Sequence, residues 1–235
     1  MALAQLNRRG LLRAGAIALL SGCDFTDRKG TQRLLRTVSH VNDHAQAALF
    51  RADVRAPLFP DSALTQPFRF NAFYTEASVP EIDVARWQLQ VGGRVHERAP
   101  WSLQAIKALP AITESTRLVC IEGWSAIGQW TGVPLGLFLK HIGADTRARY
   151  VGFRCADNYY TSIDMASALH PQTQLAWGFA GAGELPEPFG FPLRLRIPTK
   201  LGFKNAKHLM ELFVTDDFPG GYWEDLQGYN WFAGL

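Results

Sequence analysis

Residues 117–125 read Arg-Leu-Val-Cys-Ile-Glu-Gly-Trp-Ser, an apolar strand pattern that ends in a cysteine and runs into a glycine-containing turn. A thiol at the end of a strand can act as a nucleophile, a disulfide partner or a ligand for a soft or high-valent metal. The surrounding residues match no recognised cysteine-nucleophile signature. A disulfide between Cys120 and Cys155 and a metal site at Cys120 are therefore both open on these residues alone.

Short strands and short helices alternate on both sides of this stretch. Trp87 to Val91 alternates between large apolar and polar residues, which predicts a strand with one buried face. Ser102 and Asp164 are expected to cap two short helices, and Pro134 suits the first turn of a third. Further strands are expected over residues 118–121, 150–155, 175–179, 193–197 and 209–214. Because the spacing is not that of regular βαβ units, the pattern predicts one mixed, strand-rich α+β domain.

The composition excludes several classes of protein. The chain has 235 residues, of which 47% are hydrophobic and 19% charged, so it is neither disordered nor collagenous. The net charge of +3 comes entirely from residues 1–22, which hold three arginines and no acidic residue. Residues 23–235 are neutral, so we expect no nucleic-acid binding, which requires a basic surface.

The N-terminus has the features of an export signal. Arg8-Arg9 followed by Leu11-Leu12 resembles a twin-arginine signal, and the apolar stretch 14–20 is too short to span a bilayer. Leu20-Ser21-Gly22-Cys23 resembles a bacterial lipobox, in which the cysteine receives the lipid. We therefore expect a periplasmic protein that Cys23 anchors to the membrane through its acyl chains.

These features divide the chain into three parts. Residues 1–22 are expected to be the twin-arginine and lipoprotein signal peptide. Residues 23–67 are polar, mildly helical and then proline-rich, which predicts a tether and an approach segment. Residues 68–235 are expected to form the folded domain.

Charge is segregated near the C-terminus. Residues 188–210 hold five basic residues and no acidic one, whereas residues 211–235 hold five acidic residues and no Lys or Arg. Gly202-Phe-Lys-Asn-Ala-Lys207 can form a loop whose amides and ammonium groups bind a phosphate. This loop is neither a Walker A motif nor a GxGxxG turn, so a nucleotide held in those two ways is not expected. A solvated basic strand edge is the alternative.

Taken together, the motifs resemble those of the sulfite oxidase-like molybdopterin enzymes, within them most closely the exported bacterial branch that includes the methionine sulfoxide reductase catalytic subunit. The resemblance covers residues 68–235 in family order. It is carried by the stretch 117–125 with Trp130-Thr-Gly-Val-Pro134, by Asn71-Ala-Phe-Tyr74, by Gly190-Phe-Pro-Leu-Arg194-Leu, by the loop 202–207 and by the aromatic run 223–232.

The resemblance implies a molybdenum-molybdopterin cofactor with Cys120 as the catalytic residue and the protein thiolate on the metal. Cys120 could then not be paired with Cys155. It also implies contacts to the cofactor from Asn71, Tyr74, Thr75, Cys155, Phe189, Arg194, Lys204, Asn205, Ala206 and Lys207. Two of these depart from the family, since relatives carry Thr at the position of Cys155 and Asn or His at the position of Phe189. Tyr159 and Tyr160 are candidate catalytic residues that would wall the pocket, together with Trp124.

The implied activity is oxygen-atom transfer, most directly the reduction of an S-oxide such as methionine sulfoxide, small or protein-bound. Sulfite oxidation on the same fold is one alternative. It would be favoured by a basic cluster near Cys120, and Arg154 is a candidate for attracting sulfite. A non-enzymatic, lipid-anchored binding protein with a Cys120–Cys155 disulfide is the other alternative.

The resemblance also implies an external electron partner. Larger sulfite oxidases continue into a dimerisation domain beyond the point that corresponds to residue 235, and the chain has no Cys-x-x-Cys-His haem-attachment motif. We therefore expect a catalytic subunit that exchanges electrons with a membrane b-type or a soluble c-type cytochrome.

Overall fold

The computed structural model describes residues 29–181 and 183–235, so the expected signal peptide and Cys23 lie outside the described residues. The chain divides into two compact units, Met1–Asn42 and Asp43–Leu235. Among the helices of the described residues, none combines the length and the apolar character that crossing a bilayer requires.

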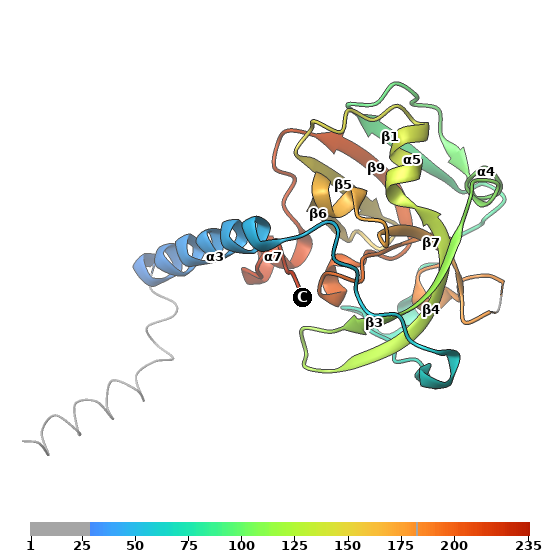
Figure 1. Cartoon of the computed structure of the whole chain (residues 1–235), viewed down its shortest axis with the longest axis horizontal. Helices are drawn as coiled ribbons and strands as arrows, with labels where there is room; N and C mark the ends of the chain where they lie inside the picture. Colours follow the sequence, from blue (N-terminus) through green and yellow to red (C-terminus); the bar gives the residue numbers. More distant parts are fainter. Residues whose placement is uncertain (1–28, 182) are drawn as a thin grey trace, which may run out of the picture. The chain divides into compact units, whose positions relative to one another are not determined.

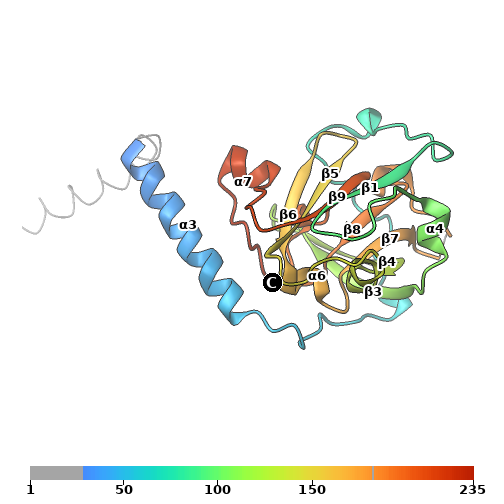
Figure 2. The same ribbon diagram turned by 90° about the horizontal axis from the view of Figure 1, so that it is seen from above.

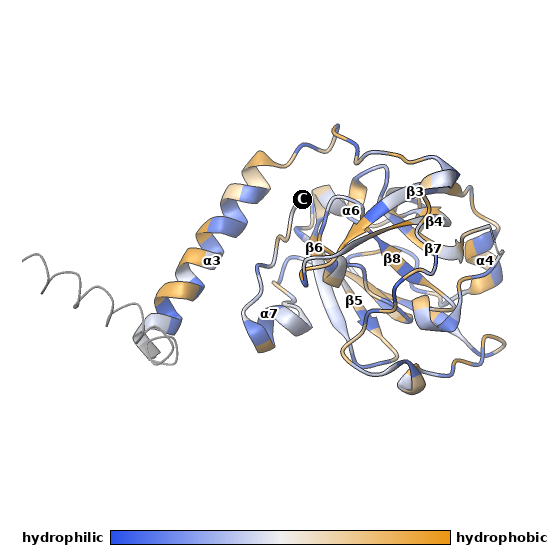
Figure 3. Ribbon diagram, turned by 90° about the horizontal axis from the view of Figure 1, so that it is seen from below, coloured by the Kyte–Doolittle hydropathy of each residue, from blue (hydrophilic) through white to orange (hydrophobic). Residues whose placement is uncertain are grey.

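The described part of the first unit is residues 29–42 of helix α3 (Lys29–Leu49), and the rest of this helix belongs to the second unit. Leu34, Val38 and Val41 recur at helical spacing, and the side chain of each is more than half exposed. Figure 3 shows apolar and polar residues interleaved along this helix. The helical character expected after residue 23 is confirmed from Lys29 onward.

The second unit is built on two sheets (Figure 1). The larger sheet has the strand order β2-β1-β9-β5-β6, in which β1 runs parallel to β9 and every other pair is antiparallel. Its strands are β1 (Gln88–Gly93), β2 (Trp101–Ser102), β5 (Tyr150–Cys155), β6 (Tyr160–Asp164) and β9 (Leu209–Thr215). The sheet therefore contains both parallel and antiparallel pairs, and it belongs to the strand-rich α+β domain that the sequence pattern predicts.

The smaller sheet is antiparallel throughout and has the order β3-β4-β7-β8. Its strands are β3 (Ile112–Val119), β4 (Ser125–Pro134), β7 (Gln174–Phe179) and β8 (Arg194–Arg196). The expected strand over residues 118–121 in fact begins at Ile112 and ends at Val119. Residues 120–124 are thus the hairpin loop between β3 and β4, whose register pairs Val119 with Ser125.

Four short helices complete the second unit: α4 (Leu103–Lys107), α5 (Leu135–His141), α6 (Met165–Leu169) and α7 (Tyr222–Gln227). The two expected caps are confirmed, because the Ser102 hydroxyl accepts a hydrogen bond from Ala105 N and the Asp164 carboxylate accepts one from Ser167 N. Pro134 lies at the N-cap of α5 rather than within its first turn. Helix α7 lies beside β6, the edge strand of the larger sheet (Figures 1 and 2).

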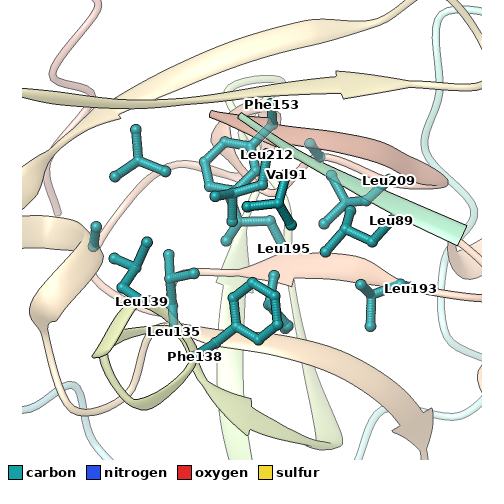
Figure 4. Close-up of a cluster of buried hydrophobic side chains, with 14 of the residues drawn as sticks. Leu89, Val91, Leu135, Phe138, Leu139, Phe153, Leu193, Leu195, Leu209 and Leu212 are labelled. Carbon is teal, nitrogen blue, oxygen red and sulfur yellow. The ribbon is translucent and has the colours of Figure 1, made fainter. Parts of the chain in front are cut away.

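The apolar core fills the space between the two sheets and α5. Figure 4 shows Leu89, Val91, Phe153 and Leu212 of the larger sheet facing Leu195 of β8 and the buried side of α5. Helix α5 contributes Leu135, Phe138 and Leu139, all completely buried. A smaller cluster of Trp130, Ala176, Phe179 and Leu185 lies apart from this core.

Part of the expected approach segment belongs to the second unit. Leu58 forms a bridge with Thr116 of β3, Phe59 N donates to Ser115 O at 3.0 Å, and Thr65 N donates to Ile127 O at 2.9 Å. These backbone bonds extend the smaller sheet at its β3 edge and reach over to β4. Residues 58–65 therefore help to hold the hairpin that carries Cys120.

Two glycines lie close to Pro134 in the sequence, and replacing each by alanine is expected to change the stability in opposite directions. A Cβ at Gly132 of β4 would collide with the backbone of Leu175 and Ala176, whereas a Cβ at Gly136 of α5 would make ordinary contacts of 3.6 Å with Leu169. We expect Gly132→Ala to lower the free energy of unfolding by about 1–3 kcal/mol, and Gly136→Ala to raise it by about 0.4–1 kcal/mol. Urea denaturation measures both, and equal effects would contradict the packing described for β4 and β7.

Candidate functional site

A tight loop holds Cys120 between β3 and β4. Cys120 N donates to Trp124 O at 2.8 Å, and Gly123 N donates to Cys120 O at 3.2 Å. Gly123 has a φ of +87°, a conformation that glycine adopts without strain. Nothing lies within 4 Å of the position of a Cβ on Gly123, so this glycine serves the turn rather than a close backbone approach.

The Cys120 side chain is 8% exposed and lines a pocket. Five segments form the wall: residues 71–73, the loop 120–122, Asp157 with Tyr159, residues 202–207 without Lys204, and Trp223 with Tyr229. Burial raises the pKa of the Cys120 thiol; a hydrogen bond from the Glu122 backbone opposes this effect, and the Glu122 carboxylate adds to it. The pocket has a volume of about 150 Å³.

Six residues expected at the site line this one pocket: Cys120, Asn71, Tyr159, Asn205, Ala206 and Lys207. The Tyr159 hydroxyl donates to Phe203 O at 2.6 Å, and burial raises the pKa of this phenol. The Asn205 amide is committed to the fold, because its oxygen accepts from Arg196 and its nitrogen donates to Leu201 O. Asn205 therefore supports the loop with its side chain and presents its other atoms to the pocket.

Lys207 supplies a cation to this pocket. Its Nζ donates to Pro188 O at 2.9 Å and lies 4.6 Å from the centre of the Phe70 ring. Burial, with a smaller contribution from the positive charge of Arg194, lowers the pKa of Lys207 to about 7. An anion bound beside Lys207 would favour its charged form.

Arg194 lies next to Lys207 but behind the pocket wall. A Cβ at Gly190 would be 3.0 Å from Lys207 Cβ and 3.1 Å from Arg194 Cβ, so Gly190 allows the two cations to lie close together. The guanidinium donates to Phe189 O and Asn205 O and stacks on Trp130 at 4.6 Å. Burial lowers the pKa of Arg194 to about 9, and its Nε has no hydrogen-bond partner among the described residues.

Lys204 is not at the pocket. Its Nζ forms an ion pair with Glu224 of α7 at 2.5 Å, and neither side chain is more than 5% exposed. The positive charge of Lys204 is therefore compensated within the protein, and Lys207 is the basic residue of the loop that lines the pocket.

The two departures from the family pattern lie outside the pocket lining. Cys155 is part of the apolar core, and burial raises the pKa of its thiol well above the ordinary value. Phe189 packs against Phe68 and Phe179 in an aromatic cluster. It reaches the site through its carbonyl oxygen, which accepts from Arg194.

The remaining expected residues also lie outside the pocket lining. The Tyr74 hydroxyl donates to the pocket residue Asp157 at 2.9 Å, so Tyr74 acts on the site indirectly. The exposed Thr75 shares a hydrogen bond with Ser78. Tyr160 donates to Asp225 at 2.8 Å, and this hydrogen bond is the main cause that raises the pKa of its phenol to about 12.

Several pocket residues were not predicted from the sequence as site residues. Asp157 follows the strand that ends at Cys155, and Phe73 lies inside the motif 71–74 without being named as a contact. Trp223 and Tyr229 belong to the aromatic run 223–232, which was assigned to the family but to no site. That run was the one available signal, because its aromatic residues are unusually dense for a chain end.

Two expectations tied to the alternatives are not met. Cys120 and Cys155 are both free thiols, so the disulfide on which the binding-protein alternative depends does not form. Arg154 is exposed and pairs with Glu211 at 2.9 Å, away from the pocket. The charged residues of the pocket lining are Glu122, Asp157 and Lys207, which is not a basic cluster.

A second cavity, of about 570 Å³, lies between residues 49–59 and the far side of β3. Val119 lines it, whereas the next residue, Cys120, lines the smaller pocket. The larger cavity contains none of the expected site residues. Among the described residues, no group of three or more His, Cys, Asp or Glu side chains is arranged to hold a metal ion.

Comparison with known proteins gives one family. The family described as "Oxidoreductase molybdopterin binding domain" matches residues 76–223. A "Putative protein-methionine-sulfoxide reductase subunit YedZ1" of Azospira oryzae is 52% identical over 220 residues, which cover 94% of this chain and 83% of that protein. The "Protein-methionine-sulfoxide reductase catalytic subunit MsrP" of Xanthomonas campestris is 33% identical over 192 residues, 71% of this chain and 59% of that protein.

The fold has a counterpart among solved structures. The crystal structure of the sulfane dehydrogenase SoxCD from Paracoccus pantotrophus matches with a TM-score of 0.56 at 17% identity. The match covers 71% of this chain and 46% of the SoxCD chain. At this identity the likeness shows a shared fold, and it agrees with the two-sheet arrangement described above.

The lowered pKa of Lys207 predicts a pH dependence of stability for the ligand-free protein. An unfolded lysine titrates near 10.5, so between about pH 7 and 10.5 the unfolded chain binds more protons than the folded one. Stability should therefore rise with pH across this window and be lowest below pH 7. We expect Lys207→Met to flatten the rise without abolishing it, since Lys200 and Arg194 also have lowered pKa values.

Urea unfolding between pH 6.5 and 9.5 measures this slope. Lys140→Met, which removes an exposed lysine from α5, is the matched control and should keep the slope of the parent. An unchanged slope in Lys207→Met would mean that Lys207 is not held in the buried position described.

Proposed function

The chain belongs to the oxidoreductase molybdopterin-binding domain family, and from this premise we propose that it reduces an S-oxide substrate by oxygen-atom transfer. The enzyme is a molybdenum-molybdopterin oxidoreductase of the sulfite oxidase-like type. The observation that carries the S-oxide proposal is a reduced, buried Cys120 in a pocket without a basic cluster.

The residues present fit the cofactor. Molybdopterin is an anion, and the site offers two adjacent buried cations, Lys207 and Arg194, whose pKa values are lowered by burial. Among the described residues, Arg194 Nε has no hydrogen-bond partner, and Lys207 Nζ donates to the carbonyl of Pro188. Both side chains therefore keep donors for a bound anion, which is expected where an anion completes the site. Cys120 provides a soft sulfur ligand, which suits molybdenum.

Each part of the chain has a distinct task in this proposal. Cys120 would bind the metal, and its short hairpin loop would keep the sulfur in one position. Lys207 and Arg194 would hold the phosphate, with the backbone of residues 205–206 beside them. When bound, the molybdenum cofactor supplies the two-electron oxygen-atom transfer chemistry that amino-acid side chains lack.

The remaining wall of the pocket suits an uncharged sulfur compound. Phe73, Trp223 and Tyr229 present aromatic surface, which makes favourable contacts with sulfur and methyl groups. Reduction of a sulfoxide takes up two electrons and two protons and releases the sulfide and water, so the substrate is neutral throughout. Sulfite is an anion at neutral pH and would meet the carboxylates of Glu122 and Asp157 in the same lining.

An external protein would deliver the electrons. The Azospira and Xanthomonas relatives are named as subunits of a reductase, which supports a partner subunit for this chain as well. We propose a membrane b-type haem protein, with a soluble c-type cytochrome as the second possibility. The chain spans 59% of the length of the Xanthomonas protein.

We also propose that the enzyme is exported by the twin-arginine route and held at the periplasmic face of the membrane by a lipid on Cys23. The support is the sequence alone: the Arg8-Arg9 pair and the lipobox-like Leu20–Cys23. Export of the folded protein would suit a cofactor that is bound before the chain crosses the membrane.

The two cysteines give a matched test of the metal site. Protein purified from a strain that makes molybdopterin should contain nearly one molybdenum per chain and reduce methionine sulfoxide with dithionite-reduced benzyl viologen. We expect Cys120→Ser to lower this activity at least a hundredfold, because it removes the only protein sulfur that lines the pocket among the described residues. Cys155→Ala, in the core, should keep the molybdenum and most of the activity.

Elemental analysis and the viologen assay decide between the outcomes. Full activity in Cys120→Ser would contradict the proposed metal ligand. A loaded parent that oxidises sulfite but leaves sulfoxides unreduced would replace the proposed reaction with its alternative.

A further inference from the structure

We propose that Glu224 is a positioning residue for the substrate, because its ion pair with Lys204 fixes the aromatic wall formed by Trp223 and Tyr229. The inference rests on the proposed function, since it concerns the same pocket. The inference gives a role to a buried ion pair whose two residues do not line the pocket.

The pair is deeply buried. Lys204 Nζ and Glu224 Oε1 are 2.5 Å apart, and the side chains are 0% and 5% exposed. Burial lowers the pKa of Lys204, and Glu224 opposes this effect. At this distance the attraction between the two charges offsets the cost of burying them, but burial of either charge alone would be strongly unfavourable. The pair therefore holds its two segments together for as long as both remain buried.

Each partner belongs to a segment that lines the pocket. Lys204 ends the short turn Gly202–Lys204, whose Gly202 and Phe203 face the pocket. Glu224 follows Trp223 directly, and the Trp223 and Tyr229 rings stack at 5.6 Å with an angle of 20°. The pair thus joins the cofactor loop to the aromatic wall, two parts of one pocket that are some twenty residues apart in sequence.

Helix α7 depends on its contacts with the rest of the unit. It has six residues, too few to be stable on its own. Leu226 is 64% exposed. Tyr222 stacks on Phe73 at 4.7 Å and packs against Tyr159, and both Tyr222 and Trp223 border the main apolar core. Two hydrogen bonds add to these contacts, from Tyr160 to Asp225 and from Ser162 to Gly220 O. The ion pair differs from these attachments because it is both ionic and buried.

The glycine at position 221 leaves the space that the Glu224 carboxylate occupies. Its φ of −174° is ordinary extended backbone, so conformation does not require a glycine here. A Cβ at this position would instead collide with the carboxylate of Glu224. Gly221→Ala should therefore displace the carboxylate from Lys204 without removing its charge.

A displaced wall should weaken substrate binding before it affects chemistry. Trp223 and Tyr229 touch the body of a substrate, whereas Cys120 and the cations hold the cofactor. A contact made equally in the ground state and the transition state affects KM and leaves kcat unchanged. Loss of the pair should therefore raise KM at constant kcat and constant molybdenum content.

The test compares Glu224→Gln with Asp225→Asn in the molybdenum-loaded enzyme. Glu224→Gln keeps the shape of the side chain and removes its charge, and Asp225→Asn makes the same change at the next, exposed residue of α7. With methionine sulfoxide and reduced benzyl viologen, we expect KM to rise at least tenfold in Glu224→Gln, with kcat and metal content within twofold of the parent. Asp225→Asn should stay within twofold of the parent in all three.

Hydrogen–deuterium exchange gives a readout that does not depend on turnover. Residues 220–231 should exchange faster in Glu224→Gln than in the parent, and at the parental rate in Asp225→Asn. If Glu224→Gln fails to fold, Gly221→Ala provides the same comparison, and we expect both its KM and its exchange rate to rise.

Two results would overturn the inference. Parental KM and parental exchange in Glu224→Gln would mean that the wall does not depend on the pair. Loss of molybdenum in proportion to activity would mean that the pair retains the cofactor and does not position substrate. If the parent itself fails to reduce sulfoxides, the proposed function fails, and the exchange rates still decide whether the pair holds the wall.

Discussion

The site depends on the hydrogen bond from Cys120 N to Trp124 O, which closes the β3–β4 hairpin loop. This bond and the register of Val119 with Ser125 turn the chain within five residues, so that the cysteine sulfur faces the pocket while the preceding side chain faces the other cavity. Strands β7 and β8 continue the same sheet. The loop after β8 then returns to it, since Leu195 N donates to Ala206 O. One sheet therefore positions both the thiol and the loop of Lys207.

The five basic residues of the segment 188–210 are close in the sequence, but they have different roles in the structure. Lys207 lines the pocket, Arg194 lies next to it behind the pocket wall, and burial lowers the pKa of both side chains. The other three bind groups of the protein: Arg196 binds Asn205, Lys200 binds Phe232 O and Asp164, and Lys204 binds Glu224, although Nε of Arg196 has no partner among the described residues. Of the acidic residues in the C-terminal segment, Glu224 is thus a counter-charge for the basic segment, whereas Glu211 and Asp216 pair with arginines outside it.

Much of the fold could be predicted from the sequence, because alternating burial and helix caps are local signals. Strand β4 was missed because small residues such as Ala126, Gly128 and Gly132 occupy its buried positions, so no large apolar residue marks most of its alternation. The pocket was predictable only in part. Cys120 and Lys207 carry their chemistry in their side chains. That Lys204 faces Glu224, and that Trp223 lines the pocket, depends on tertiary contacts between segments far apart in sequence.

The central claim is that Cys120 is the protein ligand of a molybdenum cofactor, and X-ray absorption at the molybdenum edge tests it most directly. In the loaded parent we predict the dithiolene sulfurs of the cofactor and one further sulfur around the metal, and in a molybdenum-containing fraction of Cys120→Ser the loss of that one sulfur. An unchanged sulfur count in Cys120→Ser, or a parent whose metal has no sulfur beyond the dithiolene, would contradict the account.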